Sequence, residues 1–346
     1  MKIGGSIANF GGGGSIGNLP ASLIKIQNIN GGLVSGLSGL NWNNTSDHLQ
    51  ISYAQNDILN IYKLNGDNLE LIDASLFVSS GFLGSHLLNN RLVYTSNTGK
   101  TIFHYELIGD SLIQRNVGTT NAIYIGINIS SDNYVAATTT TSPHINLFKI
   151  DGSTLIRQND PSVGNSTWHR YIKWDPSGNY LATGGDSTSP YITFFKKIGN
   201  ELIKLSNPSF QPPDIVNDIN WSLDGKYLAV GHEGAPYLTI YERDGDSLEK
   251  SSIHVDSLPS LIGAEGKTPT WQDKYMIFSL MSNGDPGPWK TLFLYRLDHG
   301  RLKLIQILES DQEEIGSMMI SIKDNLCCVH RRNSSNVLQL WKLVND

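Results

Sequence analysis

Hydrophobic and polar residues follow one pattern that recurs along this chain. In each copy, alternating apolar residues end on an aromatic, a glycine follows four positions later, and a leucine lies three positions after the glycine, as in YLTIYERDGDSL at 237–248. The last copy, LQLWKLVND at 338–346, has Asn345 in place of the glycine and stops before its leucine. The aromatics lie 43 to 54 residues apart and are Tyr62, Tyr105, Phe148, Phe195, Tyr241, Tyr295 and Trp341.

Each copy predicts a β-hairpin. The strand before the turn is apolar on both faces, which is typical of a strand covered by neighbouring sheets on both sides. The turn combines glycine with Asp, Asn or Ser, residues that accept positive φ at little cost. In the sixth copy the glycine lies one place later, at Gly300. We expect positive φ at Gly66, Gly109, Gly152, Gly199 and Gly245.

The spacing of the copies predicts the fold. A repeat of 43 to 54 residues without a helical signature indicates a radial array of β-sheets, and seven copies indicate seven blades. Two further strands precede each hairpin, for example YIKW (171–174) with YLATGG (180–185), and DINW (218–221) with YLAVGH (227–232). We therefore predict an all-β fold, a seven-bladed β-propeller of four-stranded blades.

The two ends of the chain predict how the ring closes. The segment SLIKIQN at 22–28 resembles ELIKLSN at 201–207, which is the outer strand of the fourth blade, and the seventh copy lacks an outer strand of its own. Residues 22–28 should therefore pair with 337–343, which removes an open sheet edge. The predicted domains are a glycine-rich N-terminal arm at 1–20 and the propeller at 21–346.

One blade carries a more specific resemblance. WSLDGKYLAVGHEGAPYLTIYERDGDSL, residues 221–248, resembles a blade of the WD-repeat-like β-propellers. No third strand ends in Trp-Asp, which departs from the eukaryotic WD-repeat pattern. This variant is similar to propellers of bacterial proteins and of structural proteins in tailed bacteriophage particles. The resemblance implies an interaction protein rather than an enzyme.

Composition and charge remove several classes of protein. The net charge is −6 and the positive residues are scattered, which argues against nucleic-acid binding. No run of 18 apolar residues occurs, so we expect no membrane insertion. The N-terminus lacks the apolar segment of a signal peptide. Cys327 and Cys328 are adjacent on a predicted strand, and we interpret them as small buried hydrophobic residues without a disulfide.

Motifs for catalysis are also missing from the sequence. It contains no HExxH, no Gly-x-Ser-x-Gly and no phosphate-binding glycine loop. The predicted inner strands offer mainly Asn41, Asn128, Lys173 and Asn220 as polar residues, and Asn cannot act as a general acid or base. We predict a protein that is not an enzyme, with no catalytic residue, no cofactor and no metal. A lactonase-like hydrolase, with its site over the central channel, stays as an alternative.

Candidate contact residues lie in the loops between blades and in the arm. Variable loops on a rigid scaffold are where binding is usually found. For the two tryptophans, an alternative role is to cap the hydrophobic ends of blades. The candidates in the loops are Trp168, His169, Arg170, Phe210, His254 and Trp289, and those in the arm are Ile7 and Phe10.

The first functional hypothesis is a non-enzymatic virion protein of a tailed bacteriophage, mounted by residues 1–20. Ordering this glycine-rich segment costs about 1–2 kcal/mol per residue, more than its few apolar side chains can return, so it needs a larger assembly to bind. Its partners would be other virion or scaffold proteins, copies of the chain itself among them. The alternative is a cytoplasmic WD-repeat-like scaffold that collects partners on its loops.

Overall fold

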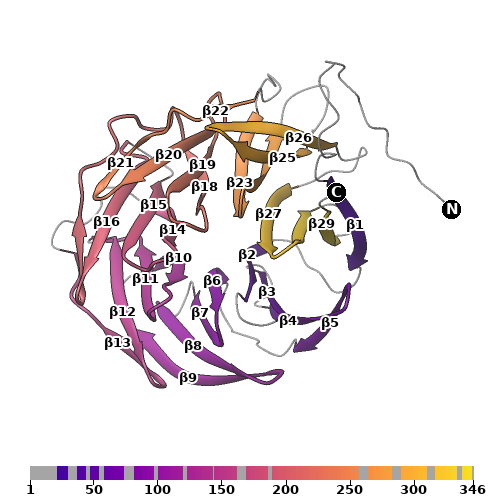
Figure 1. The fold of residues 1–346 in the computed structure, drawn as a ribbon. Coiled ribbons are helices and arrows are strands. Elements are labelled where there is room, and N and C mark those ends of the chain that lie inside the picture. Colours follow the sequence, from indigo (N-terminus) through magenta and orange to yellow (C-terminus); the bar gives the residue numbers. More distant parts are fainter. Residues whose placement is uncertain are drawn as a thin grey trace, which may run out of the picture.

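A computed structural model describes residues 22–29, 37–43, 47–53, 58–73, 82–96, 100–119, 123–142, 144–161, 169–185, 189–256, 264–282, 290–309, 316–332 and 337–344. In these residues seven sheets stand around a common centre (Figure 1). Each sheet contains four antiparallel strands, and one sheet has a fifth strand added at its outer edge. The predicted seven-bladed β-propeller is therefore confirmed.

Strands at equivalent positions in the blades are given together, from the first blade to the seventh. The innermost strands are β2 (Leu37–Trp42), β6 (Phe82–Leu88), β10 (Tyr124–Ile129), β14 (His169–Trp174), β18 (Val216–Trp221), β23 (Ala264–Gln272) and β27 (Gly316–Lys323). The second strands are β3 (His48–Tyr53), β7 (Arg91–Ser96), β11 (Tyr134–Thr139), β15 (Tyr180–Gly185), β19 (Tyr227–His232), β24 (Tyr275–Ser282) and β28 (Leu326–Arg332).

The outer half of each blade is the hairpin that the repeat predicts. The third strands are β4 (Ile58–Asn65), β8 (Thr101–Ile108), β12 (Ile145–Asp151), β16 (Ile192–Ile198), β20 (Leu238–Asp244), β25 (Lys290–Asp298) and β29 (Val337–Val344). The outermost strands are β5 (Asn68–Asp73), β9 (Ser111–Thr119), β13 (Thr154–Arg157), β17 (Glu201–Lys204), β21 (Ser247–Lys250), β26 (Arg301–Glu309) and, from the other end of the chain, β1 (Ser22–Ile29).

The ring closes through β1. This strand runs antiparallel to β29, with Ser22 opposite Val344 and Ile29 opposite Leu338, and completes the sheet β1-β29-β28-β27 (Figure 1). The predicted closure is confirmed, and the seventh blade contains strands from both ends of the chain.

Two glutamines connect β1 to the blades on either side. The backbone N–H of Leu23 donates to Gln306 Oε1 of the sixth blade at 2.7 Å. On the other side, the backbone N–H of Leu69 in the first blade donates to Gln27 Oε1 at 2.9 Å. The closing strand is thus held by three blades rather than by one.

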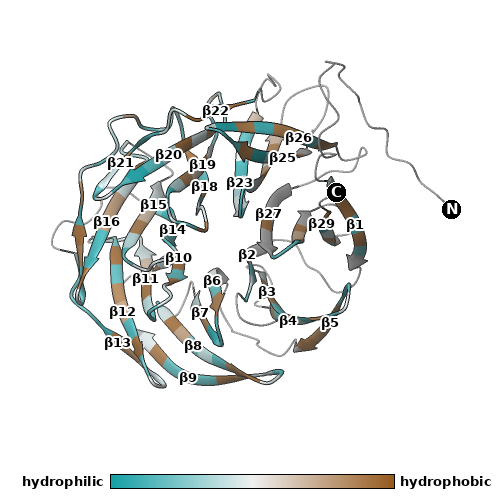
Figure 2. Ribbon diagram, in the orientation of Figure 1, coloured by the Kyte–Doolittle hydropathy of each residue, from teal (hydrophilic) through white to brown (hydrophobic). Residues whose placement is uncertain are grey.

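The hydrophobic core lies between blades. Each cluster of buried side chains takes its residues from two neighbouring sheets, as where Tyr134 and Leu147 of the third blade pack with Trp174, Leu181 and Phe195 of the fourth. Bands of hydrophobic residues, brown in Figure 2, are separated by hydrophilic residues along β8, β9 and β12. Burying one such large side chain contributes about 1.5–3 kcal/mol. The strand aromatics of the repeat therefore bind neighbouring blades together.

The glycines of the hairpin turns have the predicted backbone conformation. Their φ angles are +61°, +59°, +56°, +60° and +55° at Gly66, Gly109, Gly152, Gly199 and Gly245. In the sixth blade both His299 and Gly300 have positive φ, at +46° and +75°. A Cβ atom added at Gly245 would meet no atom within 4 Å, so the requirement for glycine is in the dihedral angle and not in the space.

The residue after the turn glycine contacts the preceding blade. An aspartate there accepts from a lysine that follows the strand aromatic of the neighbouring blade. The pairs are Lys342–Asp67, Lys63–Asp110 and Lys196–Asp246, at 3.2, 2.9 and 2.8 Å. Hydrogen bonds from Lys63 and His48 lower the pKa of Asp110, and those from Lys196 and Tyr180 lower the pKa of Asp246.

Two features of the fold were not predicted. The innermost strands β6 and β27 lack the terminal Trp or Asn that identifies the other five in the sequence. The fifth strand of the sixth blade, β22 (His254–Val255), comes from the segment before that blade and pairs parallel with β26. Asp256 fixes it, because its carboxylate accepts from Arg301 Nε at 2.5 Å and from the backbone N–H of Leu304 at 3.1 Å.

Candidate functional site

The two faces of the ring carry different connections. The hairpin face carries the first-to-second and third-to-fourth strand turns, and the loop-bearing face carries the second-to-third loops and the connections between blades. On the loop-bearing face, the starts of β14 and β18 lie near the loop that follows β19. The backbone N–H of Glu233 donates to Ile215 O at 3.0 Å and ties this loop to the chain entering β18.

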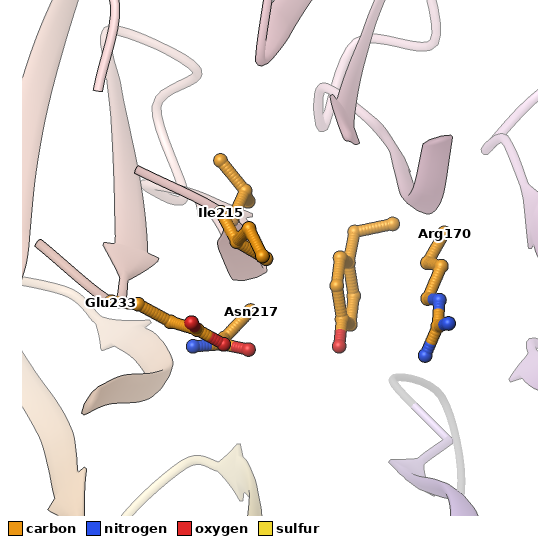
Figure 3. Close-up of a pocket in the computed structure, with 6 residues that line it drawn as sticks. Arg170, Ile215, Asn217 and Glu233 are labelled. Carbon is orange, nitrogen blue, oxygen red and sulfur yellow. The ribbon is translucent and has the colours of Figure 1, made fainter. Parts of the chain in front are cut away.

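A cavity of about 200 Å³, here called the Glu233 cavity, opens at this point. Arg170 lies on one side of it, and Glu233 and Asn217 lie together on the other (Figure 3). The fourth blade therefore supplies the cationic side of the cavity, and the fifth blade supplies its anionic side. Its lining residues are Arg170, Tyr171, Ile215, Val216, Asn217 and Glu233.

The carboxyl group of Glu233 lies in a negative environment. Partial burial raises its pKa first, and the nearby carboxylates of Glu265 and Asp214 raise it further, while Lys267 acts in the opposite direction. The side-chain nitrogen of Asn217 faces Glu233, and its contact with the carboxyl group also acts against this rise in pKa. None of the ion pairs among the described residues includes Glu233.

The loops beside the cavity form a block, residues 205–215 and 233–237, that is held by side chains. Gln211 Oε1 accepts from the backbone N–H of Ile192 at 2.9 Å, and Gln211 Nε2 donates to Pro208 O at 3.1 Å. A Cβ on Gly234 would lie 2.9 Å from Pro213 Cγ, so glycine allows the two loops to pack closely. We call these residues the blade-five loop block.

Phe210 stands on the outer part of this block. Its ring is 37% exposed and lies under Lys250, whose Nζ is 4.0 Å from the ring centroid. Its backbone carbonyl accepts from Tyr241 Oη at 3.1 Å, and the backbone N–H of Ser209 donates to Glu249 at 3.1 Å. The block thus presents an aromatic side chain in a fixed position.

On the inner strands, near the centre of the ring, the charge of Lys173 affects the pKa values of His86 and Asp218. Burial lowers the pKa of His86 to about 3, with a further contribution from the charge of Lys173. Burial also raises the pKa of Asp218, which Lys173 partly offsets. The inner strands therefore carry more ionisable groups than the sequence analysis identified, because His86 and Asp218 were not among its polar candidates.

Two predicted polar residues of the inner strands have structural partners. Asn41 Nδ2 donates to Ser85 O of the second blade at 3.1 Å, and Asn128 Oδ1 accepts from the backbone N–H of Trp174 in the fourth blade at 3.0 Å. These bonds join neighbouring blades at the centre of the ring.

The predicted contact residues are not brought together. Arg170 is exposed and lines the cavity, whereas Phe210 lies on the outer part of the block. His169 is fully buried, its Nδ1 contacts Thr183 Oγ1, and burial lowers its pKa to about 4. Its contacts in the structure are therefore within the fourth blade.

His254 lies away from the loop-bearing face, contrary to the expectation for its loop. Its backbone N–H donates to Gly300 O at 3.2 Å, which places it in β22 beside the hairpin turn of the sixth blade. No pattern in the sequence indicates this, because two residues are too short a strand to show a period. Ile7, Phe10, Trp168 and Trp289 lie outside the described residues.

Sequence reasoning missed Glu233, Asn217, Tyr171 and Asp218. A comparison of blades position by position offers a signal for Tyr171 and Asp218: the first three inner strands have glycine at the position where these two residues stand. Glu233 follows the second strand and has no counterpart in the repeat.

Cysteines, metals and membrane segments can be assessed over the same residues. Cys327 and Cys328 are free and buried, as predicted, and burial raises the pKa of both thiols. The described residues contain no group of three or more His, Cys, Asp or Glu side chains arranged to hold a metal ion. No helix in this part of the chain has the length and hydropathy needed to cross a bilayer.

Comparisons with known proteins identify the fold. No protein-family model matches the chain, and no curated protein sequence matches it. Among solved structures, it is similar to the β-propeller domain of Cps50 (Swd1) from Myceliophteria thermophila, with a TM-score of 0.69 and 14% sequence identity. The similarity covers 91% of this chain and all of that domain.

Proposed function

We propose that this protein is a non-enzymatic interaction module that binds another protein on its loop-bearing face, over the fourth and fifth blades. The observation that carries the proposal is the blade-five loop block, where an exposed aromatic and a charged cavity stand on one braced set of loops. Binding to such a surface loses little conformational entropy, because the contact residues are already in place.

A crosslinking experiment tests this proposal. The photoreactive amino acid benzoylphenylalanine replaces Phe210 in one variant and Ile198 in another. Ile198 is a matched control because it is 58% exposed but lies beside the turn glycine on the hairpin face. After irradiation in an extract of the native source, a defined protein adduct should form from position 210 and not from position 198. Equal adducts from both positions, or none from position 210, would contradict the proposal.

The absence of catalysis is part of the proposal and has its own test. The hydrolase alternative predicts turnover of lactones or esters that Asp218→Asn abolishes, because Asp218 is an acidic group near the centre of the ring. The interaction module predicts no such turnover for the unmodified protein. Lactone hydrolysis that disappears in Asp218→Asn, while the fold is retained by circular dichroism, would contradict the interaction module.

The setting of the module is a finer proposal. On the sequence resemblance given above for residues 221–248 alone, we propose a virion in which residues 1–20 attach the module to neighbouring proteins. Limited proteolysis should then cut residues 1–20 in the isolated protein and spare them in assembled particles. Equal protection in both samples would show that this segment belongs to the propeller.

A further inference from the structure

The surroundings of the Glu233 cavity have an excess of negative charge. The lysine that acts on Glu233, Lys267, forms an ion pair with Glu265. Glu233 has no ion pair among the described residues. The charged residues at the cavity are Asp214, Glu233 and Glu265 against Lys267 and, across the cavity, Arg170.

The walls of the cavity suit a long cationic side chain. Ile215 provides apolar contact for a chain of methylene groups, and Tyr171 provides an aromatic ring, which attracts cations through its face. A lysine or arginine side chain combines such a stem with a charged end. A volume of about 200 Å³ is enough for one side chain and too little for a folded element.

Arg170 limits where the positive charge can go. Because its guanidinium lies on the side opposite Glu233 (Figure 3), a cation must enter along the Glu233 side. Arginine carries only hydrogen-bond donors, so it suits a carbonyl oxygen. A peptide offers both groups at once, a basic side chain and the carbonyl of its own backbone. A free cation offers only the positive charge and no carbonyl oxygen.

We propose that the Glu233 cavity receives one lysine or arginine side chain from an extended segment of the bound partner, with the carboxylate of Glu233 as its anion and Arg170 donating to a backbone carbonyl of that segment. The segment continues along the blade-five loop block toward Phe210. This inference rests on the proposed function, because it describes the partner of the same surface.

A displayed library of random dodecapeptides tests the inference. Peptides are selected on the unmodified protein and, separately, on Glu233→Gln, which keeps the size of the side chain and removes its charge. Peptides from the unmodified protein should be enriched in Lys and Arg relative to those from Glu233→Gln. Glu201→Gln is the matched control, since Glu201 is an exposed carboxylate on the outer strand of the fourth blade.

The strongest peptide is then made with each basic residue replaced by citrulline, which keeps the shape of arginine without its charge. Loss of a charge-assisted contact should weaken binding to the unmodified protein by about tenfold. Glu233→Gln should weaken the arginine peptide and leave the citrulline peptide unchanged, whereas Arg170→Ala should weaken both alike.

The outcomes separate the two proposals. If selected peptides compete with the crosslink at position 210 but show no enrichment in basic residues, the basic segment is wrong and the loop-bearing surface stands. Selection that yields no peptide dependent on Glu233 also overturns the inference. If no peptide competes at position 210 and no adduct forms there, the proposed function itself fails.

Discussion

At the hairpin face, the same two features recur from blade to blade. A glycine with positive φ forms the turn, and the residue after it contacts the preceding blade. At the loop-bearing face over the fifth blade, the backbone contact of Glu233 with Ile215 has a counterpart between Thr140 and Ile123 of the third blade, but the side-chain contacts are not repeated. Gln211, Tyr241 and Glu249 each hold one loop in a way that no other described blade copies. Contacts that recur from blade to blade identify what every blade needs in order to fold. Contacts found in one blade alone identify what that blade does in addition.

Opening the ring should have the largest effect on stability, because both faces depend on the closed ring. Deletion of residues 1–30 removes β1, exposes the edge of β29 and takes Leu23 out of the core between the sixth and seventh blades. The truncated protein should aggregate or lose its cooperative unfolding transition in calorimetry. A cooperative transition at an unchanged temperature would show that closure contributes nothing.

As the pH falls, the buried histidines should lower the free energy of unfolding at a higher pH than the aspartates of the hairpin face do. An unfolded histidine has a pKa of about 6.5, whereas burial holds the pKa of His86 at about 3 and that of His169 and His232 at about 4. The unfolded chain therefore binds more protons below pH 6.5. The stability that these groups contribute above this pH is lost as the pH falls toward 4.

We expect the free energy of unfolding in urea to fall by roughly 2 kcal/mol per buried histidine between pH 7 and pH 5. The aspartates of the hairpin face have lowered pKa values, so their contribution persists in that interval and is lost only below pH 4. His169→Gln should reduce the change in the free energy of unfolding between pH 7 and pH 5. A free energy of unfolding that stays constant from pH 7 to pH 5 would contradict the buried, neutral histidines.

Changing one repeated turn should have a smaller effect that stays on its own face. Gly245→Val places a β-branched residue at φ +55° and should destabilise the protein by about 1 kcal/mol or more in urea unfolding. Gly245→Asn is the milder control, because asparagine tolerates positive φ. Binding at the Glu233 cavity should not change in either variant, and a change would mean that the two faces are coupled.

The smallest effect is expected from the exposed charge pair of the same turn. Asp246→Asn removes the partner of Lys196, but both side chains are solvated and such pairs contribute little. The urea midpoint of this variant should match that of the unmodified protein within error. A clear loss of stability would show that the hairpin face depends on its charges as well as on its glycines.

The fold could be predicted because its determinants recur. The spacing of the strand aromatics predicts the blades, and the likeness of 22–28 to 201–207 predicts the closing pair with 337–343; in the structure Ser22 lies opposite Val344 and Lys25 opposite Trp341. The site could not be predicted in the same way. Glu233 and Asn217 belong to two segments of one blade that meet only in the folded ring, and neither residue type recurs at its position in the other blades. The sequence identified Arg170 and Phe210 by their loops alone.

The closing strand also has a consequence for the order of events when the protein is made. Of the described strands, β1 leaves the ribosome first, and its partner β29 leaves it last. Until then, β1 has no edge to join, and the sixth and first blades have no complete neighbour between them. Pairing of the most distant parts of a chain is slow, because the ends must find each other through a large loop. Until its seventh blade is complete, the nascent propeller is therefore an open arc in which the apolar faces of the sixth and first blades are uncovered, and exposed apolar surface of this kind is what chaperones bind.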